Sequence, residues 1–264
     1  MTRDDLGDRM KRSYENRARY FLPRRTYTLI RVDGRAFHTY TRSCARPYDL
    51  DLMADMDATA IRLCQEIGGA RMAYVQSDEI SVLATDFESS QTEAWFDGSV
   101  QKIASISASL ATAAFNRARH LRMGGQAGGE VEMALFDSRA WTIPDREEVA
   151  NYFVWRQQDA SRNSVSMTAR AYFDQPRLHA LTCSELQELL WSEKGVNWND
   201  QPVGFKRGRL VVPVEEEKSV EVVDSRTGEP RTVDGVIRRS WRVVEPPVFT
   251  QERDWLLAFI PRSA

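Results

Sequence analysis

The segment "YTLIRVDGRAFHTY", residues 27–40, gives the clearest indication of the fold. Its first part, Tyr27–Val32, is a continuous apolar run with β-branched side chains, which is typical of a strand buried on both faces. The run stops at Asp33-Gly34, a pair that favours a turn. A carboxylate therefore lies at the end of a buried strand, which makes Asp33 the first candidate for a functional residue.

The next segments predict a helix and a hairpin. Residues 50–67 carry apolar side chains at spacings of three and four, which predicts an amphipathic helix closed by Gly68-Gly69. Two short apolar runs follow, Met72–Val75 and Ile80–Ala84, and they predict a β-hairpin. The bend of this hairpin carries four polar residues: Gln76, Ser77, Asp78 and Glu79.

Two long helices are predicted at residues 92–119 and 147–172, with a strand within residues 130–143 between them. The order strand, helix, hairpin, helix, strand, helix predicts an α+β fold in which helices cover a mainly antiparallel sheet. Further strands are predicted between residues 207 and 247. We therefore expect a catalytic domain at residues 1–209 and a C-terminal β-rich extension at residues 210–264.

The composition describes a chain that folds in water without crosslinks. Of the 264 residues, 42% are hydrophobic and 28% are charged, and no apolar run approaches the roughly 18 to 20 residues of a membrane span. Residues 1–20 lack the apolar centre of a secretory signal, so we expect a cytoplasmic protein with no membrane partner. The three cysteines share no C-x-x-C spacing, which argues against a disulfide framework and a zinc site.

The charge balance leaves an RNA partner open. The formal net charge is −2, which gives no overall attraction to nucleic acid. The basic residues are nearly all arginines, and the planar guanidinium binds phosphate through two parallel hydrogen bonds. The compositional bias of a GC-rich genome would explain the same excess of arginine.

Three carboxylates come from predicted strand ends. Asp33 ends the first strand, and Asp78 with Glu79 lies in the hairpin bend, so we expect all three at one edge of the sheet. Clustered carboxylates raise one another's pKa unless a cation lies among them, and hard oxygen ligands favour Mg²⁺ over zinc. A pair of such ions would activate an attacking hydroxyl and stabilise a leaving pyrophosphate, which is phosphoryl transfer. The alternative is that Asp33 only opens a turn and that Asp78-Glu79 is a polar hairpin tip.

Neighbouring residues add candidates for phosphate contacts. Gly34 allows close backbone approach, so its carbonyl or the amides of Arg35–His38 could contact a metal or a triphosphate. Lys102 could point at phosphates, although an exposed helical lysine is an equally good reading. Three further residues share one face of a predicted helix: Arg156, Asp159 and Asn163. An internally salt-bridged helix face explains this set nearly as well as a binding site does.

Six segments carry a resemblance to a known family: "RVDGRAFHTYTR", "RPYDLDLMADMDAT", "YVQSDEISVL", "VQKIASISASLATAAFN", "WRQQDASRNSVSMTARAYF" and "GVNWNDQPVGFKRG". Together they closely resemble the tRNA-His guanylyltransferase family, from about Asp5 to Arg209. The D-G-R-x-F-H and Q-S-D-E motifs in this order are the most specific part. The resemblance implies a ferredoxin-like sheet covered by helices, like the palm of polymerases. It also implies a nucleotidyltransferase that adds nucleotides to the 5'-end of tRNA, so that synthesis runs 3'-to-5'.

The resemblance also implies roles for individual residues. Asp33 and Asp78 would be the metal carboxylates, and Gly34 would offer its backbone carbonyl to two Mg²⁺ ions. ATP or GTP would be bound by Asp33, Gly34, Arg35, Ala36, Phe37, His38, Arg46, Asp49, Ser77, Asp78 and Asn163. Catalysis would involve Asp33, Asp78, Glu79 and Lys102. Arg46 stands where the family more often has lysine.

One segment departs from the family pattern. Eukaryotic members that guanylylate tRNA-His carry a His-Ile-Asn-Asn motif where this chain has "DASRNS", residues 159–164, so that only Asn163 matches. The sequence is therefore more similar to the bacterial-type relatives, which restore missing 5' nucleotides on truncated tRNA against the opposite strand of the acceptor stem.

The resemblance implies activation of a 5'-monophosphate by ATP or GTP, followed by attack of the 3'-hydroxyl of an incoming nucleoside triphosphate. The expected partners are tRNA and nucleoside triphosphates, and the family implies a homotetramer. The alternatives are addition of one guanosine to tRNA-His, a palm domain that binds nucleotide or RNA without catalysis, and a nucleotide cyclase with a similar metal pair.

Overall fold

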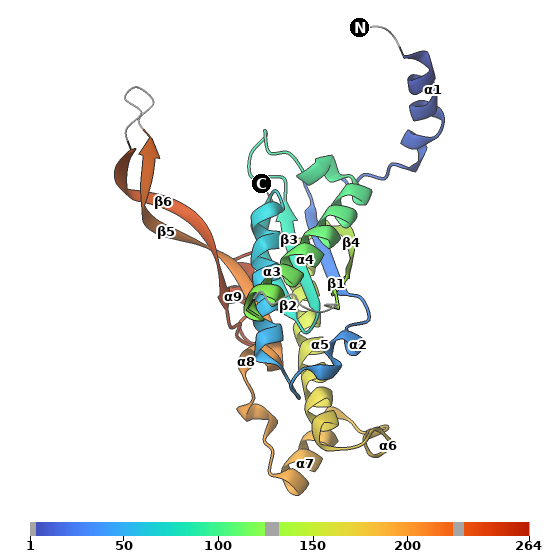
Figure 1. Cartoon of the computed structure of the whole chain (residues 1–264), viewed down its shortest axis with the longest axis vertical. Helices are drawn as coiled ribbons and strands as arrows, with labels where there is room; N and C mark the ends of the chain where they lie inside the picture. The colour runs from blue at the N-terminus through green and yellow to red at the C-terminus, as the bar shows by residue number, and fades with distance from the viewer. Residues whose placement is uncertain (1–3, 125–131, 224–229, 264) are drawn as a thin grey trace.

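The structure is a computed structural model, and it describes residues 4–124, 132–223 and 230–263 (Figure 1). Its longer helices are α3 (Leu50–Glu66), α4 (Val100–Arg122), α5 (Arg146–Tyr172) and α7 (Cys183–Lys194). Its shorter helices are α1 (Asp5–Ser13), α2 (Phe37–Tyr40), α6 (Gln175–Leu178), α8 (Val203–Arg207) and α9 (Arg253–Leu257). Its strands are β1 (Tyr27–Gly34), β2 (Ala70–Gln76), β3 (Glu79–Thr85), β4 (Phe136–Ile143), β5 (Arg209–Val223) and β6 (Pro230–Val244).

The strands form one antiparallel sheet in the order β4-β1-β3-β2-β5-β6. The predicted α+β fold with an antiparallel sheet is therefore confirmed. β1 lies between β3 and β4, and its register places Asp33 opposite Glu79 on one side and Asp137 on the other. The last residues of β1 and the β2–β3 turn thus lie at the same edge of the sheet.

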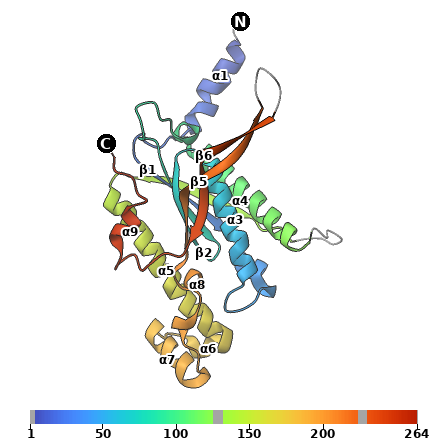
Figure 2. The ribbon, with the colours of Figure 1, turned by 90° about the vertical axis from the view of Figure 1, so that its left-hand side faces the viewer.

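Helices cover both faces of the sheet, as Figures 1 and 2 show. On one face Ile30 and Val32 of β1 pack in a core with Phe115 of α4 and residues of α3. On the other face Leu29 of β1 packs in a second core with Phe153 of α5. Burial on both faces explains why the sequence of β1 is a continuous apolar run rather than an alternating one.

The second half of α5 continues past the edge of the sheet and carries a third, smaller core (Figure 1). Val165 and Ala169 of α5 pack there against Leu186 and Leu190 of α7. α5 is therefore the element that connects the covered sheet to the α6–α7 region. Its middle turns stand beside the sheet edge at which Asp33 lies.

One predicted boundary was wrong. The helix expected at residues 92–119 begins only at Val100, because Trp95–Gly98 forms a separate 3₁₀ turn with Phe96 and Asp97 at positive φ. The strand expected within residues 130–143 is confirmed as β4, Phe136–Ile143, and residues 130–131 lie outside the described residues.

The division between residues 1–209 and 210–264 stays a prediction. β5 begins at Arg209 and pairs with β2, and Leu210 is fully buried in the second core. Residues 1–209 and the strands that follow them therefore share one sheet. None of the described helices is long and apolar enough to cross a membrane.

Candidate active site

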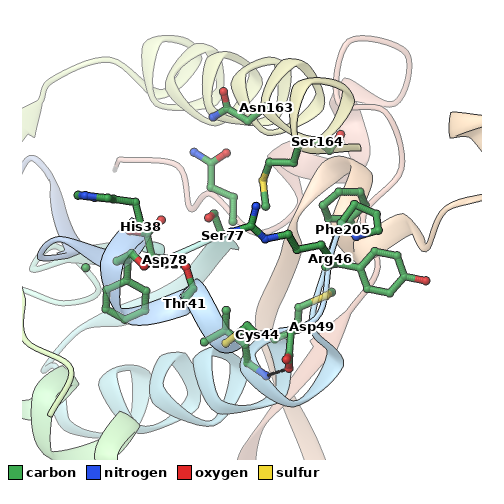
Figure 3. Close-up of a pocket in the computed structure, with 18 of the residues that line it drawn as sticks. His38, Thr41, Cys44, Arg46, Asp49, Ser77, Asp78, Asn163, Ser164 and Phe205 are labelled. Atoms are coloured by element: carbon green, nitrogen blue, oxygen red, sulfur yellow. Dashed lines mark hydrogen bonds between the residues drawn. The ribbon is translucent and has the colours of Figure 1, made fainter. Parts of the chain in front are cut away.

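A cavity of about 560 Å³ lies at the edge of the sheet where β1 ends. Its walls come from the β2–β3 turn, from the segment between α2 and α3, from α5 and from α8. In Figure 3, Thr41, Cys44 and Asp49 lie on one side, Asn163 and Ser164 of α5 lie on the other, and Ser77 and Asp78 lie between them. This volume is in the ordinary range for small-molecule sites, roughly 300–1,000 Å³.

The two strand ends that carry Asp33 and Asp78 are joined by a backbone hydrogen bond. The N–H of Gly34 donates to the carbonyl of Asp78 at 3.0 Å. Ser77, the first residue of the two-residue hairpin turn, has a φ of 45°. A non-glycine residue with this φ costs of order 1–3 kcal/mol, and such strain persists where the surrounding structure holds it. The turn that carries Asp78 is therefore held in a strained backbone conformation at Ser77.

Both carboxylates are partly or largely removed from water. Burial raises the pKa of Asp33, and the neighbouring carboxylate of Asp137 adds to this effect. Burial also raises the pKa of Asp78, against a hydrogen bond from Ser77, and the negative charge of Asp33 contributes in the same direction. The protein therefore stabilises the negative charge of each carboxylate only in part, and a cation bound between the two would stabilise it further.

The donor set fits Mg²⁺. Asp33, Asp78 and Gly34 all line the cavity, so two carboxylates and a backbone carbonyl stand close to one another. These are hard oxygen donors, and Mg²⁺ is commonly held by one or two carboxylates while water and substrate phosphates complete its shell. Within the described ranges no three His, Cys, Asp or Glu side chains gather as a closed metal cage. The arrangement therefore suits an ion shared with a bound triphosphate.

Glu79 lies at the same edge of the sheet, as expected, but its carboxylate does not join Asp33 and Asp78 in the cavity. Its carboxylate receives two hydrogen bonds from Arg156 of α5, at 2.8 and 2.6 Å, and it does not line the cavity. The sequence placed Glu79 next to Asp78 but could not reveal the arginine opposite it.

The segment after β1 folds tightly over the cavity. A Cβ on Gly34 would lie 2.3 Å from the Phe37 ring, which is buried against Phe115 and Phe136, so only glycine fits. Ala36 has a left-handed conformation with φ 54° and precedes α2. Of the eleven residues predicted to bind nucleotide, ten line the cavity, and Arg35 is the exception.

Arg46 and Asp49 occupy different parts of the same wall. Figure 3 shows Arg46 reaching into the cavity from the segment before α3. Asp49 is the N-cap of α3 and accepts hydrogen bonds from the backbone N–H groups of Leu52 at 2.9 Å and Ala45 at 3.0 Å. Burial acts to raise the pKa of Asp49, but these backbone hydrogen bonds outweigh it and lower the pKa. Arg46 thus offers a cation to the cavity, while Asp49 shapes its wall.

Lys102 does not line the cavity. It lies in the first turn of α4, exposed, with its ammonium group 6.0 Å from the centre of the Phe96 ring. The α4 helix packs on the face of the sheet opposite α5, so the fold directs this turn away from the walls of the cavity. Lys102 therefore cannot make the predicted phosphate contact with a nucleotide bound in this cavity.

Several lining residues were missed from the sequence. Tyr48 and Phe205 form a ring pair with centroids 5.0 Å apart, and Arg170 and Arg209 also line the cavity. Phe205 belongs to the segment "GVNWNDQPVGFKRG", which carried part of the family resemblance, so the signal was present without an assigned role. Arg170 lies two turns beyond Asn163 on α5, and only the helical periodicity could have indicated it.

Comparison with known proteins agrees with this geometry. Residues 7–144 match the sequence profile of the tRNAHis guanylyltransferase (Thg1) family. A bacterial tRNA(His) guanylyltransferase-like protein solved in complex with ATP is 41% identical, with a TM-score of 0.81 over 97% of this chain and 99% of that one. A corresponding structure in complex with GTP is 40% identical, with a TM-score of 0.78 over 98% and 100% of the two chains.

A curated relative gives the same assignment. The tRNA(His) guanylyltransferase of Kluyveromyces lactis is 29% identical over 212 residues, which are 75% of this chain and 87% of the relative. The match to the family profile, the palm-like fold shared with the bacterial structures and the cavity lined by Asp33 and Asp78 agree with one another. The chain therefore belongs to the tRNAHis guanylyltransferase family, nucleotidyltransferases that add nucleotides at the 5'-end of tRNA.

Proposed function

We propose that this protein restores missing nucleotides at the 5'-end of truncated tRNA by 3'-to-5' synthesis, with the opposite strand of the acceptor stem as template. The observation that carries the proposal is that Asp33 and Asp78 come together in the wall of a cavity large enough for a nucleotide. The bacterial relatives bound to ATP and to GTP support a nucleoside triphosphate as its occupant.

Two Mg²⁺ ions held by Asp33, Asp78 and the carbonyl of Gly34 would neutralise charge on the attacking and leaving oxygens of phosphoryl transfer. The protein's own residues bind and orient the substrates. Arg46 is placed to offer a bidentate cation to the triphosphate. The backbone around the left-handed Ala36 presents successive N–H groups that suit phosphate oxygens.

The base of the nucleotide would bind at the part of the cavity that Tyr48 and Phe205 line. Tyr48 and Phe205 offer aromatic faces, and stacking on such faces accepts any base. Nucleotide choice would then come from pairing with the template strand. This fits an enzyme that restores different nucleotides on different tRNAs.

The reaction has two transfers. An oxygen of the RNA 5'-monophosphate attacks the α-phosphorus of ATP or GTP, and pyrophosphate leaves. The 3'-hydroxyl of the incoming nucleoside triphosphate then attacks the activated 5'-phosphorus, loses its proton, and the nucleoside monophosphate leaves. An RNA with a 5'-triphosphate needs only the second transfer, with pyrophosphate as leaving group.

The alternative is addition of a single guanosine to tRNA-His, which is the activity named for the yeast relatives. The segment 159–164 speaks against a fixed tRNA-His substrate, because only Asn163 of the His-Ile-Asn-Asn motif is kept. Assembly into tetramers and a cytoplasmic location complete the proposal and follow from the family resemblance and the composition.

Incorporation of labelled nucleotide tests the proposal directly. The purified protein is incubated with ATP, GTP and Mg²⁺, and with either full-length tRNA-His or a set of tRNAs that lack their first nucleotide. We expect faster, template-matched addition to the truncated set. Faster addition of guanosine to full-length tRNA-His would favour the alternative, binding without any addition would favour a non-catalytic domain, and a cyclic nucleotide formed without RNA would identify a cyclase.

A further inference from the structure

Arg156 and Glu79 form a buried ion pair beside the cavity. Arg156 donates from Nε to one carboxylate oxygen of Glu79 at 2.8 Å and from Nη2 to the other at 2.6 Å. Arg156 is 7% exposed and Glu79 is 8% exposed. The pair joins the middle of α5 to the first residue of β3, which directly follows the Ser77-Asp78 turn.

The carboxylate of Glu79 is fully engaged by the protein. In addition to Arg156, its Oε1 accepts hydrogen bonds from Gln76 at 3.4 Å and from Ser81 at 3.3 Å. The cation of Arg31 lies 3.9 Å from its Oε2. A carboxylate with these partners has little capacity left for a metal ion or a substrate proton.

Arg156 is also linked, through Asp159, to Asn163 in the α5 wall of the cavity. Its Nη2 lies 3.2 Å from Asp159, and Asp159 accepts a hydrogen bond from the amide of Asn163 at 3.5 Å. Asn163 and Asp78 both line the cavity, one from α5 and the other from the hairpin turn (Figure 3). One guanidinium thus connects the turn that carries a metal carboxylate to the helix that carries a wall residue.

The aromatic ring of Trp155 covers this connection. The guanidinium carbon of Arg156 lies 4.5 Å from the centre of that ring. Removal from water strengthens hydrogen bonds between charged groups and makes loss of one partner costly.

We infer that Arg156 and Glu79 are positioning residues, which fix the Ser77-Asp78 turn and Asn163 relative to each other so that the cavity binds Mg²⁺ and nucleoside triphosphate together. The inference rests on the proposed function for the identity of this ligand. It replaces the catalytic role expected for Glu79 from the sequence. It also explains why arginine is needed at residue 156, since a lysine ammonium cannot form the planar, two-bonded contact.

Arg156→Lys tests this inference, with Arg162→Lys as the matched control. Arg162 contacts the same Asp159 at 3.0 Å, but its side chain is 54% exposed, and within the described part of the chain it forms no hydrogen bond or ion pair with Glu79. Binding of ATP in the presence of Mg²⁺ is measured by calorimetry without RNA. We expect Arg156→Lys to weaken binding roughly ten- to hundredfold, the effect of losing charged hydrogen bonds, and Arg162→Lys to bind like the wild type.

Hydrogen exchange separates positioning from general stability. The Gly34 amide reports on the turn because it donates to the Asp78 carbonyl. We expect Arg156→Lys to speed exchange of this amide while amides in the middle of α3 keep their wild-type rates. Wild-type ATP binding together with wild-type exchange at Gly34 would overturn the inference, and so would faster exchange throughout the chain.

Asp159→Asn provides the second variant, in case Arg156→Lys does not fold. It removes the charge that links Arg156 to Asn163 and leaves the Arg156–Glu79 pair in place. We expect weaker Mg²⁺-dependent ATP binding with unchanged exchange at Gly34, whereas wild-type binding would contradict the inference. Because neither measurement uses RNA, absence of nucleotide addition by the wild type would refute the proposed function and leave the positioning role standing.

Discussion

Asp55 and Asp78 are two buried carboxylates that the protein treats in opposite ways. Asp55 of α3 is fully buried and is bound by Arg119 at 3.2 Å and Arg122 at 2.9 Å, both from α4. Asp78 has no arginine or lysine within 4 Å among the ion pairs of the described residues, and burial raises its pKa. Asp55 therefore fastens two helices together, whereas Asp78 carries a charge that the fold leaves available.

The difference shows how structural acids can be separated from binding acids in this molecule. Asp57 follows the first pattern, because Arg209 holds it at the end of β5, and Glu79 follows it through Arg156. Asp33 is closer to the second pattern, because Arg139 lies 3.9 Å from it but only 3.2 Å from Asp137, and burial raises the pKa of Asp33 despite this arginine. Acids held at close range by arginine stabilise the fold, and acids without such a close partner can bind a cation.

The largest expected effect is on catalysis. Asp78→Asn removes the uncompensated charge, so we expect Mg²⁺-dependent nucleotide addition to fall by roughly a thousandfold, since a catalytic metal supplies several kcal/mol. The melting temperature of the metal-free variant should be equal to or above that of the wild type, because an unfavourable buried charge is lost. Activity close to wild type, or a strongly lowered melting temperature, would place Asp78 with the structural acids.

Asp55→Asn gives the opposite result in this comparison. Loss of the carboxylate leaves Arg119 and Arg122 without their shared partner, and we expect the free energy of unfolding to fall by about 3 kcal/mol. Chemical denaturation measures this value. The folded variant should retain nucleotide addition at low temperature, and an unchanged unfolding midpoint would show that the two arginines do not depend on Asp55.

Gly34→Ala tests how closely the chain is packed at the site. The added Cβ would lie 2.3 Å from the ring of Phe37, and that ring cannot move freely because it packs against Phe115 and Phe136. We expect the free energy of unfolding to fall by about 2 kcal/mol, as is usual for overpacking. Ala36→Gly is the control, since it relieves a left-handed φ and should not destabilise the protein by clash. Equal stability of Gly34→Ala and wild type would contradict the tight packing.

The smallest expected effect is on the pH dependence of stability. Burial raises the pKa of Asp33 and Asp78, so the folded chain binds these protons more tightly than the unfolded chain. Their contribution to the stability of the metal-free protein therefore rises as pH falls through the raised pKa values, and it levels off below the ordinary pKa of aspartate. The difference in melting temperature between wild type and an Asp33→Asn/Asp78→Asn double variant measures it. A difference that does not change with pH would contradict the raised pKa values.

The sequence predicted most of the fold because local pattern and tertiary environment agree there. The apolar run Tyr27–Val32 and the spacing in residues 50–67 each became the expected element, β1 and α3. The helix start near residue 92 was wrong because a 3₁₀ turn held by tertiary contacts precedes α4, and such a turn has no periodicity of its own.

The site could be predicted only in part. The D-G-R-x-F-H and Q-S-D-E motifs located Asp33 and Asp78 correctly at one cavity. They could not show that Glu79 is engaged by Arg156, which is 77 residues away in the sequence. The same limit applies to Lys102, because sequence spacing does not determine on which face of the sheet a helix packs.

Electron paramagnetic resonance of Mn²⁺ in the presence of ATP measures whether Asp33 and Asp78 hold metal ions beside the bound nucleotide. We expect the wild type to bind a pair of Mn²⁺ ions per chain with ATP, Asp78→Asn to lose binding beyond the ion carried by ATP, and Asp55→Asn to bind like the wild type. Wild-type protein that holds no Mn²⁺ beyond the ATP-bound ion, or Asp78→Asn that binds like the wild type, would contradict this expectation.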